Sequence, residues 1–220
     1  MKPVSPSEPR VPPQVFLVRL GPRVGEPRVG GVRHNPSMTE TADFLPVPEP
    51  SGWLSTADLT RIRRQVPVLY VDAVPVRVDP NGAVTEVGLL LRASPQGVIT
   101  RALVSGRVHR GERIRDALLR HLEKDLGPMA LPRIPASPQP FTVAEYFPTP
   151  GVSPYYDPRQ HAVSLAYVVP VDGDCQPQQT ALDLAWMSPE EAVGQEVQLD
   201  MMGGQGMLLR QALAHVGRLV

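Results

Sequence analysis

Hydrophobic side chains recur every four positions in one segment near the middle of the chain. They are Ile114, Leu118, Leu122 and Leu126. This spacing places them on one face of a helix over residues 113–126. Gly127 followed by Pro128 is a typical helix end. The pattern therefore predicts an amphipathic helix that packs its apolar face on a core.

Other segments are rich in β-branched and aromatic residues and predict strands. These segments are residues 68–79, 85–93, 98–104 and 161–171. The turn Pro80-Asn81-Gly82 joins the first two into a hairpin. Residues 184–192 predict a strand that leads into a helix capped by Ser188, and residues 207–217 predict a closing amphipathic helix. Strands and helices together indicate an α+β domain.

The N-terminal segment has a different composition from the rest. Residues 1–50 are proline-rich, so we expect a disordered tail that cannot bury enough apolar surface to order itself. The composition changes after Met38, which makes Met38 an alternative start and leaves open whether 1–37 belong to the native protein. Ser55 is expected to cap a helix. We divide the remainder into a helical embellishment over 51–66 and a folded domain over 67–220.

The charge distribution limits the classes of partner. The net charge is zero, but residues 1–38 carry +4, which leaves −4 for the rest. An acidic body argues against binding of long nucleic acid. No apolar run is long enough to cross a membrane, and no signal peptide is visible. With Cys175 as the only cysteine, we expect a reduced, cytoplasmic setting and no disulfide.

A basic stretch precedes the predicted helix over 113–126. Its basic residues are Arg101, Arg107, Arg110, Arg113 and Arg115, and Glu112 is the one acid among residues 101–115. Backbone N–H groups at a helix N-terminus also favour anions. The stretch is either a phosphate-binding segment or a solvated basic face.

Residues 106–127 resemble a Nudix box, whose pattern is G-x5-E-x7-R-E-U-x-E-E-x-G-U, with U a large aliphatic residue. The residues that match this pattern are Gly106, Glu112, Arg120, Leu122 and Gly127. Where the family has glutamates, this chain has His121, Lys124 and Asp125, and Pro128 replaces the final aliphatic residue. The chain resembles uncharacterised Nudix-like proteins of high-GC bacteria.

Three further segments resemble parts of a Nudix domain. They are the hairpin over 68–93, the strand-to-helix segment over 184–192 and the turn at 146–151. The turn is similar to one in ADP-ribose pyrophosphatase-type members, whose following loop often carries another catalytic acid. Glu145 and Asp157 are the candidates, although Asp157 also suits an Asp-Pro turn and Glu145 a solvated strand. The resemblance implies an α/β/α sandwich around a mixed sheet, with the box helix and the C-terminal helix on opposite faces.

The resemblance also implies a reaction. Nudix hydrolases cleave the pyrophosphate of a nucleoside diphosphate linked to another group, with Mg²⁺ or Mn²⁺. By this analogy Glu112, His121 and Asp125 are the catalytic candidates, and the Gly106 carbonyl, His121 and Asp125 are the metal ligands. Lys124 weakens this prediction, because an ammonium about 4 Å from a divalent ion costs roughly 8 kcal/mol at an effective dielectric constant of ~20.

The expected ligand is a nucleotide or another phosphorylated small molecule. Arg101, Arg107, Arg110 and Tyr155 are the candidate binding residues. Tyr155 and its neighbour Tyr156 either stack on a nucleobase or cover the sheet. A homodimer is implied by the resemblance. Three hypotheses remain: a divergent pyrophosphohydrolase with an impaired metal site, a nucleotide sensor without metal, and a protein-interaction module, since fold does not fix function.

Overall fold

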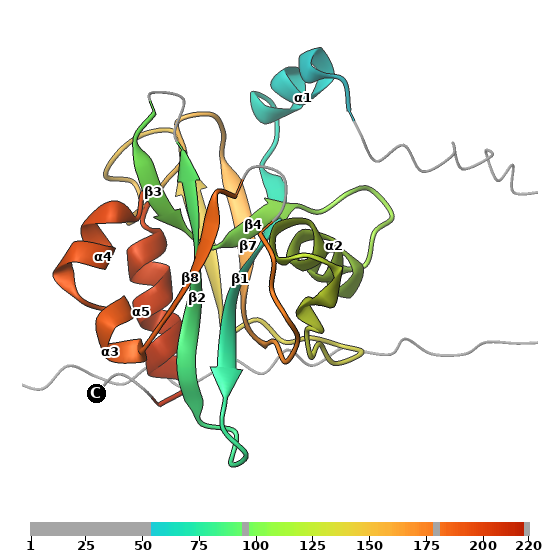
Figure 1. Ribbon diagram of the computed structural model, residues 1–220. Coiled ribbons are helices and arrows are strands. Elements are labelled where there is room, and N and C mark those ends of the chain that lie inside the picture. Colours follow the sequence, from blue (N-terminus) through green and yellow to red (C-terminus); the bar gives the residue numbers. More distant parts are fainter. Residues whose placement is uncertain (1–53, 94–96, 178–180, 218–220) are drawn as a thin grey trace, which may run out of the picture. The chain divides into compact units, whose positions relative to one another are not determined.

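The computed structural model describes residues 54–93, 97–177 and 181–217 of the chain. The predicted disordered tail over 1–50, with Met38 as its alternative start, lies outside the described residues. Figure 1 shows the described part as a central sheet with helices on both sides. The predicted α+β class is therefore confirmed.

The sheet is mixed, as predicted. Its eight strands in the described residues are β1 (Val68–Val78), β2 (Val84–Ala93), β3 (Ile99–Ala102), β4 (Val104–Arg107), β5 (Thr142–Phe147), β6 (Tyr155–Tyr156), β7 (Ala162–Pro170) and β8 (Asp183–Met187). The main order is β3-β2-β1-β7-β5-β6, while β4 pairs with β1 and β8 pairs with β2. The long strand β1 runs parallel to β7 and antiparallel to β2 and β4. It is the centre of the sheet.

Helices cover both faces of the sheet, and the first helix lies apart from the others (Figure 1). The helices are α1 (Thr56–Arg63), α2 (Ile114–Leu126), α3 (Pro189–Ala192), α4 (Gln195–Asp200) and α5 (Gln205–His215), with a short 3₁₀ turn, η1 (Pro128–Ala130). Figure 1 shows α2 on one side of the sheet and α3, α4 and α5 on the other. This is the predicted α/β/α arrangement. No helix in the described ranges is long and apolar enough to cross a membrane.

Each face of the sheet has its own hydrophobic core. On one face Val71 and Leu122 belong to a single buried cluster, and on the other Val76 and Leu209 do. Successive side chains of a strand point to opposite faces, so β1 supplies both clusters. Because β1 is covered on both sides, its sequence is a nearly continuous hydrophobic run instead of an alternating one. Complete burial of one leucine contributes roughly 1.5–3 kcal/mol.

Local sequence signals set the element ends. Gly127 ends α2 with a positive φ of 87°, a conformation that glycine adopts without strain. Ser188 begins α3 in a reciprocal capping box with Glu191. The predicted strand over 98–104 instead divides into β3 and β4. The amide of Leu103, at the break, donates to the side chain of Gln205 at 3.0 Å and not to a neighbouring strand.

The helix α1 forms where it was predicted but buries none of its residues. Ser55 accepts a hydrogen bond from the Asp58 amide at 3.1 Å and caps it. Its link to the sheet domain is a hydrogen bond of 2.7 Å from Arg63 Nε to Oε1 of Gln160. This helix is thus attached by a polar contact and not by a shared core.

Candidate functional site

The loop before α2 is held by an ion pair between two residues of the Nudix-like pattern. Arg120 Nε and Nη2 donate to the two carboxylate oxygens of Glu112, each at 2.7 Å, and the His109 amide donates to Glu112 at 2.8 Å. The Arg120 guanidinium, through these hydrogen bonds, lowers the pKa of Glu112 to about 2. Glu112 is therefore an ionised carboxylate whose two oxygens are both engaged by this one chain.

His121 fills the space next to the glycine at the start of the pattern. Its Nε2 lies 3.0 Å from the carbonyl oxygen of Arg107, so this nitrogen carries the proton and donates. A Cβ atom on Gly106 would lie 1.8 Å from the His121 ring. Burial lowers the pKa of His121, which keeps the imidazole neutral. Glycine at position 106 is thus required by the ring of His121.

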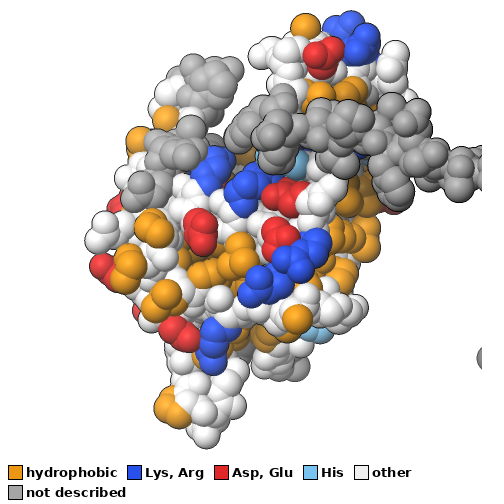
Figure 2. All heavy atoms as spheres, turned by 90° about the vertical axis from the view of Figure 1, so that its right-hand side faces the viewer, with side chains coloured by type: hydrophobic (Ala, Val, Ile, Leu, Met, Phe, Trp, Pro, Cys, Tyr) orange, Lys and Arg blue, Asp and Glu red, His pale blue; other side chains and the backbone are white. Residues whose placement is uncertain are grey.

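Asp125 is completely buried and lies between two cations. Arg92 Nη2, from the end of β2, is 2.8 Å from Asp125 Oδ2, and Lys124 Nζ is 3.6 Å from Oδ1. A buried carboxylate is stable when cations of the same chain compensate its charge. Figure 2 shows the face that carries α2, where basic and acidic side chains lie next to one another. We call Arg92, Glu112, Arg120, His121, Lys124 and Asp125 the box cluster.

The present contacts of the box cluster compete with the binding of a divalent ion, although His121 Nδ1 and the two Asp125 oxygens have no hydrogen-bond partner in the described part of the chain. The Glu112 oxygens bind Arg120, the protonated nitrogen of His121 binds a carbonyl, and two cations flank Asp125. Among the described residues, no three His, Cys, Asp or Glu side chains are grouped so that they could hold a metal ion. A hard divalent cation needs several free oxygen ligands. The cluster instead supplies its own positive charges.

A cavity of about 460 Å³ lies on the opposite face of the sheet from α2. Asp72 lines it and lies on the same face of β1 as Val74 and Val76, which pack toward α5. We call this cavity the Asp72 pocket. Its aromatic and charged lining residues are Tyr70, Asp72, Arg101, Tyr146, Tyr156, Asp157 and Arg159. The volume lies within the range of small-molecule sites, about 300–1,000 Å³.

The inner wall of the pocket is built around Asp72. This carboxyl group is 1% exposed and accepts a hydrogen bond of 3.1 Å from the hydroxyl of Tyr146. Burial raises the pKa of Asp72, and hydrogen bonds from Ser105, Ser164 and Tyr146 oppose the rise. These residues come from four strands, β1, β4, β5 and β7. The sheet therefore gathers an acid and three hydroxyl groups at one point.

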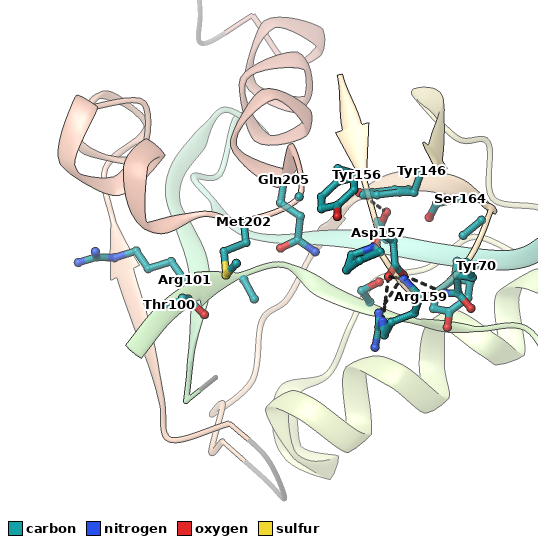
Figure 3. A pocket seen from close by; sticks show the side chains of 17 residues that line it. Tyr70, Thr100, Arg101, Tyr146, Tyr156, Asp157, Arg159, Ser164, Met202 and Gln205 are labelled. Carbon is teal, nitrogen blue, oxygen red and sulfur yellow. Dashed lines mark hydrogen bonds and ion pairs between the residues drawn. The ribbon is translucent and has the colours of Figure 1, made fainter. Parts of the chain in front are cut away.

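The outer part of the pocket holds a second acid beside an arginine. Arg159 Nε and Nη2 donate to the two oxygens of Asp157 at 2.8 and 2.9 Å, and Gln160 Nε2 donates to Asp157 at 3.0 Å. Burial acts to raise the pKa of Asp157, but the hydrogen bonds from Arg159 outweigh it and the pKa is lowered. In the view of Figure 3 this pair lies between Tyr156 and Tyr70.

The residues predicted from the sequence are divided between these two places. Glu112, His121 and Asp125 come together in the box cluster, as their spacing predicted, and Gly106 lies against His121. Arg107 contributes its carbonyl there. Neither Arg107 nor Arg110 is among the residues that line the Asp72 pocket. The box helix and the Asp72 pocket are thus separate features.

Two predicted binding residues lie close to the pocket, but with other contacts. Arg101 lines it, yet its guanidinium forms an ion pair with Asp200 and points away from the centre in Figure 3. Tyr155 is buried in the core and its hydroxyl donates to Gln211 at 3.0 Å. The neighbouring Tyr156 lines the pocket. Neighbouring side chains of a strand point to opposite faces, so Tyr155 packs in the core while Tyr156 lines the pocket.

One residue in the sequence is a signal for the pocket. Asp72 is an acid in the middle of the hydrophobic run VLYVDAVPV, and acids are almost never buried without a partner. Arg159 gave no signal, because a single arginine in a loop is common on any surface. Asp157, a candidate catalytic acid in the sequence, is paired with Arg159 in the structure.

Comparison with known proteins agrees with this fold. A family model described as a domain of unknown function (DUF4916) matches residues 49–218. A crystal structure of a possible asymmetric diadenosine tetraphosphate (Ap4A) hydrolase from Jonesia denitrificans is 68% identical, covering 71% of this chain and 98% of that one, with a TM-score of 0.70. A comparison with curated proteins gave no match.

Two more distant structures share the fold. The Nudix domain of NrtR from Shewanella oneidensis, in complex with ADP ribose, is 18% identical and covers 81% of this chain and 99% of that one, with a TM-score of 0.50. A Nudix hydrolase from Nitrosomonas europaea is 17% identical and covers 70% and 92%, also with a TM-score of 0.50. The fold and the box framework together define a Nudix-type protein. Within that class, the chain belongs to the DUF4916 family.

Proposed function

We propose that this protein binds a nucleotide in the Asp72 pocket and that it does so without a divalent metal ion. The observation that carries the proposal is the separation of the two sites. The pocket has the aromatic and polar lining of a nucleotide site, whereas the carboxylates of the box cluster are neutralised by Arg92, Lys124 and Arg120. This is the function of a sensor or regulator that has kept the pocket and has an impaired metal site.

The chemistry of the pocket supports a phosphorylated ligand. Tyr70 and Tyr156 offer ring faces on which a nucleobase can stack. Arg159 uses two of its five N–H donors on Asp157, so further donors remain for a phosphate oxygen. Its side chain is 65% exposed, at the outer part of the pocket where a charged group stays in contact with water.

The test is a calorimetric titration with a panel of nucleoside diphosphates and ADP-ribose in the presence of EDTA. We expect binding, and we expect Arg159→Ala to weaken it about tenfold or more, because a charge-assisted hydrogen bond contributes roughly 1.5–3 kcal/mol. Arg61→Ala is the matched control, since it removes an arginine paired with an aspartate on α1, outside the pocket. No heat with any nucleotide at millimolar concentration would refute the proposal.

A second candidate function is hydrolysis of a nucleoside-diphosphate-linked pyrophosphate. The observation in its favour is the 68% identity with the Jonesia denitrificans protein, together with the preserved Glu112–Arg120 pair. In this case Glu112, His121 and Asp125 would be catalytic, and the Gly106 carbonyl, His121 and Asp125 would take up Mg²⁺ or Mn²⁺ after moving away from their present partners.

The hydrolase hypothesis has a direct assay. Diadenosine tetraphosphate and ADP-ribose are incubated with the protein and Mn²⁺, and the nucleotide products are separated by chromatography. Turnover that Asp125→Ala or His121→Ala abolishes would support it, with Asp174→Ala, at an exposed acid outside both sites, as the control. Turnover unaffected by Asp125→Ala and His121→Ala would assign the activity elsewhere.

Three broader predictions accompany the proposal. We propose that residues 67–220 are the ligand-binding domain and that residues 51–66 are an added helical segment. A homodimer and a cytoplasmic location also stay predictions. Light scattering after gel filtration measures whether the protein is a homodimer. Limited proteolysis tests the domain boundary.

A further inference from the structure

The innermost charged group of the Asp72 pocket lacks a cation. Within the described ranges Asp72 takes part in no ion pair; it accepts a hydrogen bond from the Tyr146 hydroxyl, and the hydroxyls of Ser105 and Ser164 lie near it. This arrangement contrasts with Asp157 and Asp125, which lie against arginines. An acid without a cation, at the inner wall of a cavity, can still accept hydrogen bonds from a ligand.

The hydrogen-bond direction at this wall is fixed by Tyr146. Its hydroxyl donates to Asp72 Oδ2 at 3.1 Å, so the lone pairs of the tyrosine oxygen are directed elsewhere. Serine hydroxyls can donate to the same carboxyl group in the same way. The Asp72 oxygens and the Tyr146 oxygen can still accept hydrogen bonds, so the inner wall suits a ligand group that presents N–H donors.

Gln205 adds one donor to the lining. Its Oε1 accepts the Leu103 amide at 3.0 Å, which fixes the orientation of the side-chain amide and leaves its NH₂ group for other partners. Gln205 lines the same cavity as Asp72. Two acceptor oxygens of a carboxylate and one amide donor match a planar group that has two adjacent N–H donors and a carbonyl oxygen.

We propose that Asp72 is the specificity-determining residue of the pocket and that the pocket takes a guanine-type nucleobase, whose ring N–H and amino groups donate to the Asp72 carboxylate. This inference rests on the proposed nucleotide binding and specifies the nucleobase of the bound nucleotide. Guanine presents adjacent N1–H and N2–H₂ donors next to a carbonyl, whereas adenine presents an amino group next to an acceptor. Tyr70 and Tyr156 then contact the base faces, and the phosphates lie toward Arg159.

The first test compares nucleoside diphosphates that differ only in the base. Titration calorimetry in EDTA measures GDP, IDP, which lacks the amino group, and ADP. We expect GDP to bind about ten to a hundred times more tightly than ADP, with IDP between them, because each lost bond to a charged group weakens binding by about tenfold or more. Equal affinities for GDP and ADP would overturn the inference.

The second test reverses the preference. Asp72→Asn replaces one acceptor by a donor, and xanthine carries a carbonyl where guanine has its amino group. We expect this variant to lose about tenfold or more in GDP affinity and to gain affinity for XDP relative to the unsubstituted protein. A misfolded protein cannot gain affinity, so the gain separates a specificity role from a structural one.

A matched control is Glu86→Gln, which removes a negative charge from the exposed part of β2, outside the pocket. It should leave the order GDP, IDP, ADP unchanged. If circular dichroism shows that Asp72→Asn is folded, but the variant loses affinity for GDP without gaining affinity for XDP, the inference fails. If nucleotides bind with no preference for guanine, the inference fails and the proposed function stands; if no nucleotide binds, the proposed function itself fails.

Discussion

Acids on the two faces of the sheet have different surroundings, and Asp125 and Asp72 are the most deeply buried of them. On the α2 face, Glu112 and Asp125 each lie against cations of the same chain. On the α5 face, Asp72 is surrounded by hydroxyl groups. A carboxylate that is already compensated stabilises the fold, whereas one that keeps acceptor capacity in a cavity can bind a ligand. The box cluster, which resembles the family motif, and the Asp72 pocket, which is suited to binding, are therefore different parts of the molecule.

The largest expected effect comes from breaking the buried pair on the α2 face. Arg92→Met removes the cation at 2.8 Å from Asp125, and Lys124 at 3.6 Å compensates only in part. We expect a loss of about 3 kcal/mol in the free energy of unfolding, measured with urea. Arg133→Met removes an arginine from a half-exposed pair with Asp172 and should cost less than about 1 kcal/mol. Similar losses in both variants would mean that the Asp125 site is not structural.

The second prediction concerns the contact between Gly106 and His121. Gly106→Ala places a methyl group 1.8 Å from the ring, and we expect a cost of about 2–3 kcal/mol in unfolding free energy. In a His121→Ala background the ring is gone, so the same substitution should cost less than about 1 kcal/mol. A double-mutant cycle by urea unfolding measures this coupling. Additive effects would show that His121 does not occupy this space.

The third prediction uses acid to weaken the α2 face. The pKa of Glu112 is lowered from 4.5 to about 2, so its ion pair contributes stability that is present above pH 4.5 and lost as the pH falls toward 2. With solvent screening allowed for, we expect this loss to be about 1–2 kcal/mol. Unfolding free energies of the protein and of Glu112→Gln, followed between pH 5 and 2, should converge. A constant difference across this range would contradict the ion pair.

The smallest expected effect has the opposite sign and lies on the α5 face. Burial raises the pKa of Asp72 in the folded state, so the stability it contributes is present below the unfolded pKa and is lost as the pH rises through the folded pKa. Asp72→Asn has no carboxyl group to ionise, so it does not lose this stability as the pH rises. Relative to the unsubstituted protein it should therefore gain stability between acid and neutral pH, by about 1 kcal/mol. A relative loss over the same interval would mean that the ionised form is the stabilised one.

The secondary structure and the box cluster were predictable from local pattern. The four-residue repeat of α2, the capping box at Ser188 and the glycine end at Gly127 each depend on a few neighbouring residues. The same is true of Glu112, His121 and Asp125, which one loop and one helix bring together. The break between β3 and β4 was missed because it depends on Gln205, about a hundred residues away.

The Asp72 pocket was not predictable in the same way. Ser105, Tyr146 and Ser164 meet Asp72 only because β4, β5 and β7 neighbour β1 or one another in the sheet. Arg92 reaches Asp125 from another element for the same reason. Lys124, in contrast, is adjacent to Asp125 in the sequence, so its repulsion of a metal ion could be predicted from the sequence. The local sequence pattern does not predict which distant strands pair, and the pocket depends on that pairing.

The measurement that tests the account most directly is a pair of calorimetric titrations of GDP, one in EDTA and one in excess Mn²⁺. The account predicts one site per chain and dissociation constants that agree within about threefold, since the chain's own cations compensate the box cluster. Binding that appears only with Mn²⁺, and that Asp125→Asn abolishes, would contradict it and assign the ligand to a metal site on α2.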